Sequence, residues 1–191
     1  DSGLEYPETI QYINNMTQQY DINLHIIKAS PDALTLLEKT GIWNNRRKID
    51  EKYLLKDFHD TLITQPSAKA HEIFGEKEIN GLRAEESAGR KVLLSKNTGI
   101  YTRKKHHDKV CSPIWRWTSK EVRAYLDEHD IEVNPVYTKL AELSVSEQNQ
   151  RVGLAFDANG LEWGRVTWLK AGWPDLWATI VERLPRVQEW G

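Results

Sequence analysis

Residues 81–90 read Gly-Leu-Arg-Ala-Glu-Glu-Ser-Ala-Gly-Arg, and the rest of the chain is best interpreted outward from this stretch. It follows a short apolar run and precedes a polar segment with helical character. Arginine is a planar, permanently charged donor that suits phosphate oxygens, and a helix that begins near Ser87 adds backbone N–H groups and its dipole. One interpretation is a nucleotide site at the end of a strand, with candidate contacts Gly81, Arg83, Glu85, Glu86, Ser87 and Arg90. From composition alone, the alternative is a strand end followed by a solvated, salt-bridged helix start.

Predicted strands and helices alternate on both sides of this stretch. Apolar spacing and capping signals predict helices at 7–20, 67–74, 118–129, 134–143 and 174–184. Extended, aliphatic-rich segments predict strands at 22–29, 78–83, 98–102 and 110–115, and residues 144–172 are expected to be loop-rich. The alternation predicts an α/β fold with a mainly parallel sheet flanked by helices.

The turn Asp1-Ser2-Gly3 is expected to share a crevice with residues 81–90. Both segments follow predicted strand ends, and ligands of open α/β sheets bind outside the carboxyl ends of the strands. We therefore add Asp1, Ser2 and Gly3 to the candidate nucleotide contacts.

Composition bounds the class of protein. The chain has 191 residues, of which 39% are hydrophobic and 28% charged, with a formal net charge of −2. We expect an α/β domain over 1–143 and a packed extension over 144–191, because five of the eight tryptophans lie from Trp163 onward. No apolar run is long enough to cross a bilayer. The single cysteine, Cys111, excludes a disulfide framework or an iron–sulfur cluster within these residues and favours a cytoplasmic setting.

Further basic side chains are candidate secondary contacts. The segment 103–109 is the strongest basic patch; it is either a solvated hairpin tip or a contact for a ligand phosphate or a nucleic-acid backbone. The candidates are Lys104 and Lys105 within it, and Arg116, Arg151 and Arg165 elsewhere. The histidines, His71 among them, are scattered without ligand spacing, so no metal site is predicted.

Three ordered motifs resemble one family. Residues 81–90 match Gly-Leu-Arg-Ala-Glu-Glu-Ser-x-x-Arg, residues 1–9 resemble Asp-Thr-Gly-x-x-Phe-Pro-Glu-Thr, and residues 112–117 with 134–137 resemble Pro-Ile-x-Asp-Trp followed by Asn-Pro-Leu-Tyr. This is the pattern of the phosphoadenosine-phosphosulfate reductase family, within the adenine-nucleotide α-hydrolases or N-type ATP pyrophosphatases. Arg116 stands where the family usually has Asp.

The resemblance implies an enzyme that cleaves ATP between its α and β phosphates, with ATP or a related adenine nucleotide and Mg²⁺ as cofactors. It implies that Arg83 and Arg90 contact phosphate or sulfate, that Glu85 and Glu86 either orient them or hold Mg²⁺, and that Ser87 caps the helix. Asp1, Ser2 and Gly3 are expected near the adenosine. Members of this class also serve DNA sulfur modification, which implies a sulfur-carrying protein partner and leaves nucleic acid as a weaker expectation.

Two departures keep alternatives open. The family's phosphate loop, Ser-Gly-Gly-x-Asp-Ser, is not found in residues 1–191, so we expect either a fragment or processed form, or a degenerate member. The cysteine motif Glu-Cys-Gly-x-His of the family's reductases is also not found, and Cys111 is expected to be a small buried residue. The alternatives to an ATP pyrophosphatase are a thiol-dependent reductase and a non-catalytic binding or assembly module.

Overall fold

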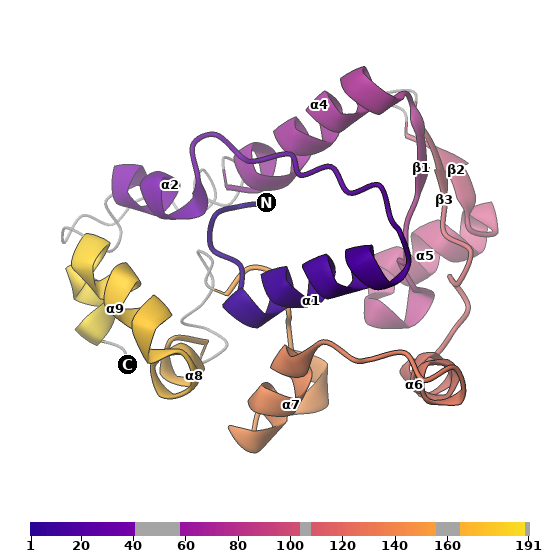
Figure 1. The fold of residues 1–191 in the computed structure, drawn as a ribbon. Coiled ribbons are helices and arrows are strands. Elements are labelled where there is room, and N and C mark those ends of the chain that lie inside the picture. Colours follow the sequence, from indigo (N-terminus) through magenta and orange to yellow (C-terminus); the bar gives the residue numbers. More distant parts are fainter. Residues whose placement is uncertain (41–57, 104–107, 156–164, 190–191) are drawn as a thin grey trace. The chain divides into compact units, whose positions relative to one another are not determined.

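A computed structural model describes residues 1–40, 58–103, 108–155 and 165–189. The chain divides into two compact units, one formed by residues 1–67 with 134–191 and the other by residues 68–133 (Figure 1). Helices dominate the first unit, and a small sheet with its helices forms the second. The predicted α/β class is confirmed. The predicted division into a domain over 1–143 and an extension over 144–191 does not coincide with these two units, and it stays a prediction.

Helices form the first unit. They are α1 (Pro7–Gln19), α2 (Ala33–Thr40), a π-helical turn (Asp60–Thr64), α7 (Pro135–Glu142), α8 (Arg165–Gly172) and α9 (Pro174–Arg183), with 3-10 turns at Glu147–Asn149 and Pro185–Glu189. Helix α4 (Gln65–Phe74) follows the π-helical turn directly and continues into the second unit.

The buried core of the first unit joins both ends of the chain. Leu4, Leu140 and Leu169 are each 1% exposed or less and belong to one cluster of buried side chains. The rings of Tyr6 and Trp173 lie 4.3 Å apart, and the Trp173 indole N–H donates to Glu8 at 2.7 Å. Part of the predicted extension 144–191 thus packs in the same core as the N-terminal residues.

Two predictions in the first unit are wrong. Residues 22–29 carry no assigned strand, although they are not helical, and Ile22, Leu24 and Ile26 are exposed. A strand needs a paired neighbour to satisfy its backbone groups. The backbone here instead makes isolated bonds: Ala29 N–H donates to the Asp1 carbonyl at 2.8 Å, and the Ile27 carbonyl accepts from the Asp1 amino group at 2.9 Å. Residues 165–172, expected to be loop, form α8 because Val166 and Leu169 are spaced to bury one helical face.

The second unit contains a three-stranded sheet in the order β1-β3-β2. Strand β1 (Lys77–Ile79) is parallel to β3 (Lys109–Cys111), with Glu78 opposite Val110. Strand β2 (Ile100–Thr102) is antiparallel to β3, with Tyr101 opposite Val110. The predicted strands are therefore present but shorter, and the sheet is mixed because a short connection joins β2 to β3 as a hairpin.

Helix α5 (Ala88–Asn97) lies beside the three strands in Figure 1 and follows a 3-10 turn (Ala84–Glu86); α6 (Ser119–Glu128) follows β3. Within residues 68–103 and 108–133, the buried hydrophobic side chains are those of Leu94 and Val110. The apolar core of this unit is therefore small, and polar contacts carry more of its organisation.

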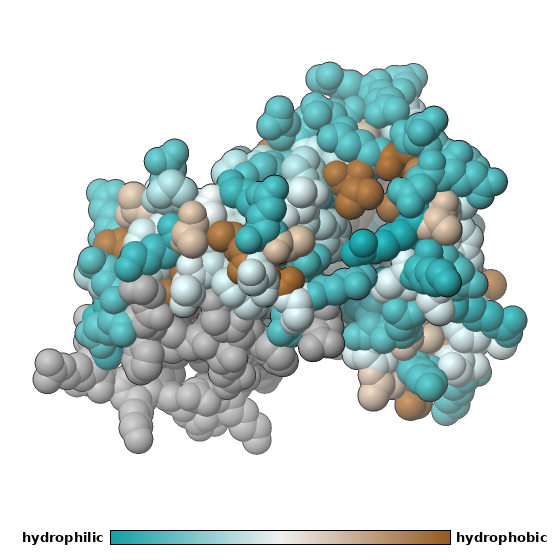
Figure 2. Space-filling view, turned by 90° about the horizontal axis from the view of Figure 1, so that it is seen from below, coloured by the Kyte–Doolittle hydropathy of each residue, from teal (hydrophilic) through white to brown (hydrophobic). Residues whose placement is uncertain are grey.

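The face drawn in Figure 2 is mostly hydrophilic, with hydrophobic residues exposed in small groups. Scattered exposure of this kind is ordinary for a globular surface. In the part of the chain that the structure describes, no helix combines the length and apolar character needed to cross a membrane.

Candidate functional site

The segment 81–90 follows the carboxyl end of β1 and is fixed by hydrogen bonds to the loop after β3. Asn80 N–H donates to the Cys111 carbonyl at 3.0 Å, and Ala84 N–H donates to the Trp115 carbonyl at 2.8 Å. Ser112 Oγ donates to the Asn80 side-chain oxygen at 2.7 Å. These bonds follow from the parallel pairing of β1 and β3, which brings the ends of both strands to the same edge of the sheet.

Ser87 begins α5, as predicted. Its backbone is extended, and its hydroxyl oxygen accepts from Arg90 N–H at 3.2 Å. The free N–H groups of a helix N-terminus attract anions, so the first turn of α5 adds positive potential beside the two arginines.

Arg83 lies against the start of α6. Its guanidinium donates to Ser119 Oγ at 3.3 Å and to the Trp117 carbonyl at 3.4 Å. Its Nε lies 3.5 Å from a carboxylate oxygen of Glu86, and the side chain is 15% exposed. A guanidinium carries five N–H donors, so these contacts leave capacity for a ligand.

Glu86 links the two arginines of the segment. Its carboxylate pairs with Arg83 and also with Arg90, and it accepts from Arg83 N–H at 3.2 Å. The Arg90 side chain is 43% exposed, and an exposed ion pair contributes little to stability. Arg90 can therefore turn to a phosphate group at small cost, whereas Glu86 keeps Arg83 in place.

Glu85 is engaged at the N-terminus of α6. Its carboxylate accepts from Ser119 Oγ at 2.8 Å and from Ser119 N–H at 3.1 Å. The hydrogen bonds from Ser119 hold the pKa of Glu85 below its usual value. Of the two roles expected for Glu85 and Glu86, the contacts favour positioning of neighbouring groups over metal ligation.

Residues 1–3 belong to the other compact unit. Gly3 N–H donates to the Asp1 carboxylate at 2.8 Å, and the Ser2 carbonyl accepts from Ala33 N–H at 2.8 Å. Gly3 has φ +81°, and a Cβ added there would lie 3.0 Å from the Cβ of Asp32, so glycine suits this tight turn. The shared crevice with residues 81–90 stays a prediction.

The secondary candidates do not gather in one described place. Arg116 lies over the Trp115 ring, 4.6 Å from its centroid. Arg151 donates to the Gln150 carbonyl at 2.7 Å in the other unit. Lys104 and Lys105 lie outside the described residues, and Arg165 is the first residue of α8, with a side chain outside the described part.

The structure also bears on three expectations outside the segment. Arg103, expected at a solvated hairpin tip or a phosphate contact, forms ion pairs with Glu78 and Asp108. His71, expected to be isolated, lies within reach of the same two carboxylates. Sequence spacing could not reveal this group, because the pairing of β1 with β3 brings Asp108, directly before β3, into the neighbourhood of Glu78. Cys111, expected to be buried, is half-buried in β3.

The chain is an α/β protein, a class whose ligands commonly bind at the carboxyl ends of strands, where residues 81–90 supply two arginines and a helix N-terminus. The model of the phosphoadenosine phosphosulfate reductase domain matches residues 1–145. The chain belongs to this family.

Curated relatives agree with this assignment. The chain is 29% identical over 144 residues to the phosphoadenosine 5'-phosphosulfate reductase of Aliivibrio fischeri; the aligned region covers 72% of this chain and 51% of the relative. It is 28% identical over 141 residues to the enzyme of the same name from Citrobacter koseri; the aligned region covers 72% of this chain and 52% of the relative. The chain thus spans about half the length of the curated relatives it matches.

A solved structure shares the fold. The phosphoadenylyl-sulfate reductase of Candida auris, solved as a phosphate complex, matches with a TM-score of 0.53 at 18% identity. The match covers 77% of this chain and 64% of that protein. At this identity the likeness concerns the fold alone.

Proposed function

We propose that this chain binds an adenine nucleotide through residues 81–90 and serves an ATP pyrophosphatase that transfers the adenylyl group to an acceptor. One observation carries the proposal: Arg83 and Arg90 are both held by Glu86 beside the first turn of α5. The resemblance of this segment to the family motif supports the choice of an adenine nucleotide as the ligand.

In the proposed reaction, an acceptor oxygen attacks the α-phosphorus of ATP. The bond from that phosphorus to the oxygen shared with the β-phosphorus breaks, and pyrophosphate leaves with the bonding electrons. Arg83 and Arg90 balance the charge of the phosphates and of the leaving group. Fixed positive groups of this kind stabilise a transition state because they need no reorganisation during the reaction.

Mg²⁺ would enter with the nucleotide, bound to its phosphates, where it neutralises part of their charge. Glu85 and Glu86 supply the carboxylate oxygens that Mg²⁺ prefers, but Ser119 donates to Glu85 and Arg83 pairs with Glu86. These carboxylates therefore serve to position the arginines and α6. No protein ligand to Mg²⁺ is assigned here.

A protein partner that carries sulfur is proposed to work with this activity, by analogy with the class. Nucleic acid is a weaker proposal. Of the basic patch 103–109, Arg103 is engaged with two carboxylates, and Lys109 is exposed. Interaction with nucleic acid should therefore depend on Lys109 and leave Arg103 in place.

Calorimetric titration with Mg·ATP tests the binding step. Arg90→Ala is the most informative variant because this side chain is largely exposed, so the fold should survive the change. Loss of one charge-assisted hydrogen bond should weaken ATP binding about 10- to 100-fold. Lys91→Ala removes a neighbouring exposed charge of the same sign and should leave the affinity unchanged. Equal affinities in both variants would contradict the proposed site.

Product analysis separates the reaction classes. Release of AMP and pyrophosphate from ATP supports the pyrophosphatase, whereas sulfite release from phosphoadenylyl sulfate that is lost in Cys111→Ser would establish the reductase instead. The names of the relatives favour the reductase. Against it, the one cysteine of this chain lies in β3 and not in the cysteine motif Glu-Cys-Gly-x-His of the family's reductases. If calorimetric titration detects no binding of any adenine nucleotide, the remaining hypothesis is a non-catalytic binding or assembly module.

A further inference from the structure

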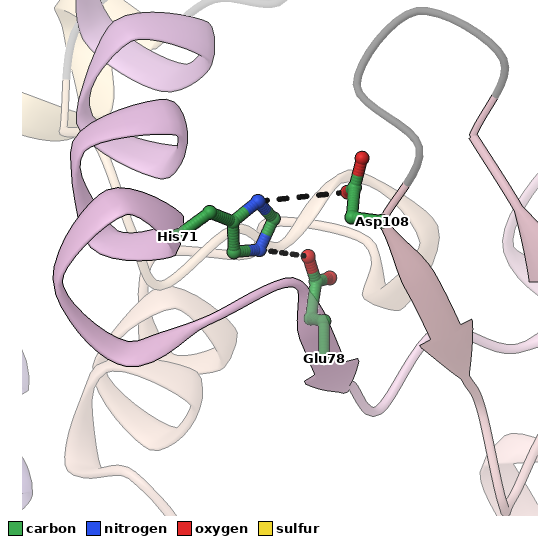
Figure 3. A group of neighbouring side chains, drawn as sticks. All are labelled: His71, Glu78 and Asp108. Carbon is green, nitrogen blue, oxygen red and sulfur yellow. Dashed lines mark ion pairs between the residues drawn. The ribbon is translucent and has the colours of Figure 1, made fainter.

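A histidine and two carboxylates from three elements meet on the side of the sheet where β1 and β3 begin (Figure 3). His71 lies in the last turn of α4, Glu78 in β1, and Asp108 directly before β3. His71 Nε2 lies 3.4 Å from a Glu78 oxygen, and Nδ1 lies 3.6 Å from an Asp108 oxygen. Residues 81–90 follow the other end of β1, and the Asn80 side-chain amide, which donates to Glu78 at 2.8 Å, lies between them and the cluster.

Asp108 is the unexplained member of this group. Its side chain is 1% exposed, and neither carboxylate oxygen has a hydrogen-bond partner among the described residues. A buried carboxylate is costly unless charges or hydrogen bonds compensate it. Such a group, aimed into a cluster with an imidazole and a second carboxylate, indicates a ligand.

The charges of the cluster do not balance without a further cation. The nearest cation is Arg103, with NH1 3.1 Å from Asp108 and NH2 paired with Glu78. Burial acts to lower the pKa of Arg103, but the charge and hydrogen bond of Glu78 and the charge of Asp108 raise it, so the guanidinium stays protonated. Two carboxylates against one guanidinium leave room for a bound cation in the cluster.

We propose that His71, Glu78 and Asp108 bind one divalent transition-metal ion of the Zn²⁺ or Mn²⁺ class. One ligand atom from each residue lies within 4.8 Å of the others. Tetrahedral ligands about 2.1 Å from Zn²⁺ lie about 3.4 Å apart. Glu78 faces Nε2 of His71 whereas Asp108 faces Nδ1, so binding requires the side chains to rotate until both carboxylates meet one ring nitrogen. The imidazole favours Zn²⁺ or Mn²⁺ over Mg²⁺, which prefers oxygen ligands.

The ion would join the end of α4 to the beginnings of β1 and β3. Arg103 would stay on the carboxylates as an outer partner that orients them, as hydrogen-bonded groups behind metal ligands commonly do. Residues 68–133 have few buried hydrophobic side chains among those described, and small units with little apolar core gain stability from a bound metal.

Metal uptake by the whole chain tests the proposal directly. Protein stripped with chelator and freed of any tag is titrated with ZnCl₂ and MnCl₂ against a chromophoric competitor. We expect one ion per chain and a rise in melting temperature on loading. Co²⁺ should give a visible absorption band of a protein-bound site, a signal that a purely structural ion-pair cluster does not produce.

Matched variants locate the ion. Asp108→Asn and Glu78→Gln keep the side-chain size and should weaken binding at least 10-fold, and His71→Ala should do the same. His129→Ala is the control, because this exposed histidine stacks on Tyr125 instead; it should bind as the unaltered chain does. Circular dichroism confirms that each variant is folded.

Failure of the unaltered chain to take up one ion would overturn the proposal. Uptake that survives in all three ligand variants would also overturn it. Both outcomes are independent of nucleotide binding at residues 81–90.

Discussion

Gly99, between α5 and β2, is the position where the structure makes the sharpest prediction about stability. Its φ is +77°, and a Cβ added there would lie 2.3 Å from Trp115 Cδ1 and 3.0 Å from the Ser112 carbonyl oxygen. Gly99→Ala therefore meets two penalties. The left-handed backbone costs a side-chain-bearing residue about 1–2 kcal/mol, and forcing the indole to move costs about 1–3 kcal/mol more. The sum is a loss of about 2–5 kcal/mol.

Two other glycines separate the penalties. Gly75 has φ +96° with nothing within 4 Å of an added Cβ, so Gly75→Ala should show the backbone cost of about 1–2 kcal/mol alone. Gly89 lies in the first turn of α5 and has neither the positive φ nor a close neighbour, so Gly89→Ala should leave stability unchanged or raise it by up to about 1 kcal/mol. The difference between the Gly99 and Gly75 variants measures the contact with Trp115.

The assay is urea unfolding followed by circular dichroism, with hydrogen exchange of peptides from residues 81–117. Because the Trp115 carbonyl accepts from Ala84 N–H, a displaced Trp115 should also raise exchange in residues 81–90. Equal stabilities of the Gly99 and Gly75 variants would refute the packing argument. Equal stabilities of all three would refute the backbone argument as well.

Three further perturbations follow from described contacts. Thr118→Ala removes the hydroxyl that accepts from Glu121 N–H and should cost about 1 kcal/mol, seen as faster hydrogen exchange in α6. Leu140→Ala, at a side chain 1% exposed, should cost about 2–5 kcal/mol in urea unfolding. Burial opposes the shift, but hydrogen bonds from Lys139 and Trp173 lower the pKa of Glu8 below 4.5. The stability they add is present above that pH and lost as pH falls through the folded pKa. The urea concentration at the unfolding midpoint should therefore fall less steeply with decreasing pH in Glu8→Gln than in the unaltered chain.

Local rules of sequence predicted the helix ends well. Thr118 and Glu121 form the predicted capping box, and Asn134 caps α7 by accepting from Val136 N–H at 3.0 Å. Gly75 follows α4 with a positive φ, as its sequence position indicates. These features involve residues two to four apart, so the sequence contains all the information that they require.

Features that depend on distant partners could not be predicted in the same way. Residues 22–29 have the composition of a strand, but strand formation depends on a neighbour that composition does not specify. Helix α8 was missed because glycine and tryptophan around it suggested loops, while its buried face becomes evident only against the core that contains Leu140. The cluster of His71, Glu78 and Asp108 likewise depends on the pairing of β1 with β3.

The candidate site falls between these two cases. Together with the motifs at 1–9 and 112–137, the motif in residues 81–90 indicated the family, and the structure then shows why the segment after β3 accompanies it. Parallel neighbours β1 and β3 end at one edge, so Ala84 bonds to Trp115 and Glu85 bonds to Ser119. A phosphate that drew Arg83 toward it would act on Ser119 and the first turn of α6 as well. Glu85 and Glu86 thus keep the two arginines and α6 in one arrangement. Replacing either carboxylate should weaken ligand binding mainly because the arginines move, and less because a negative charge is lost.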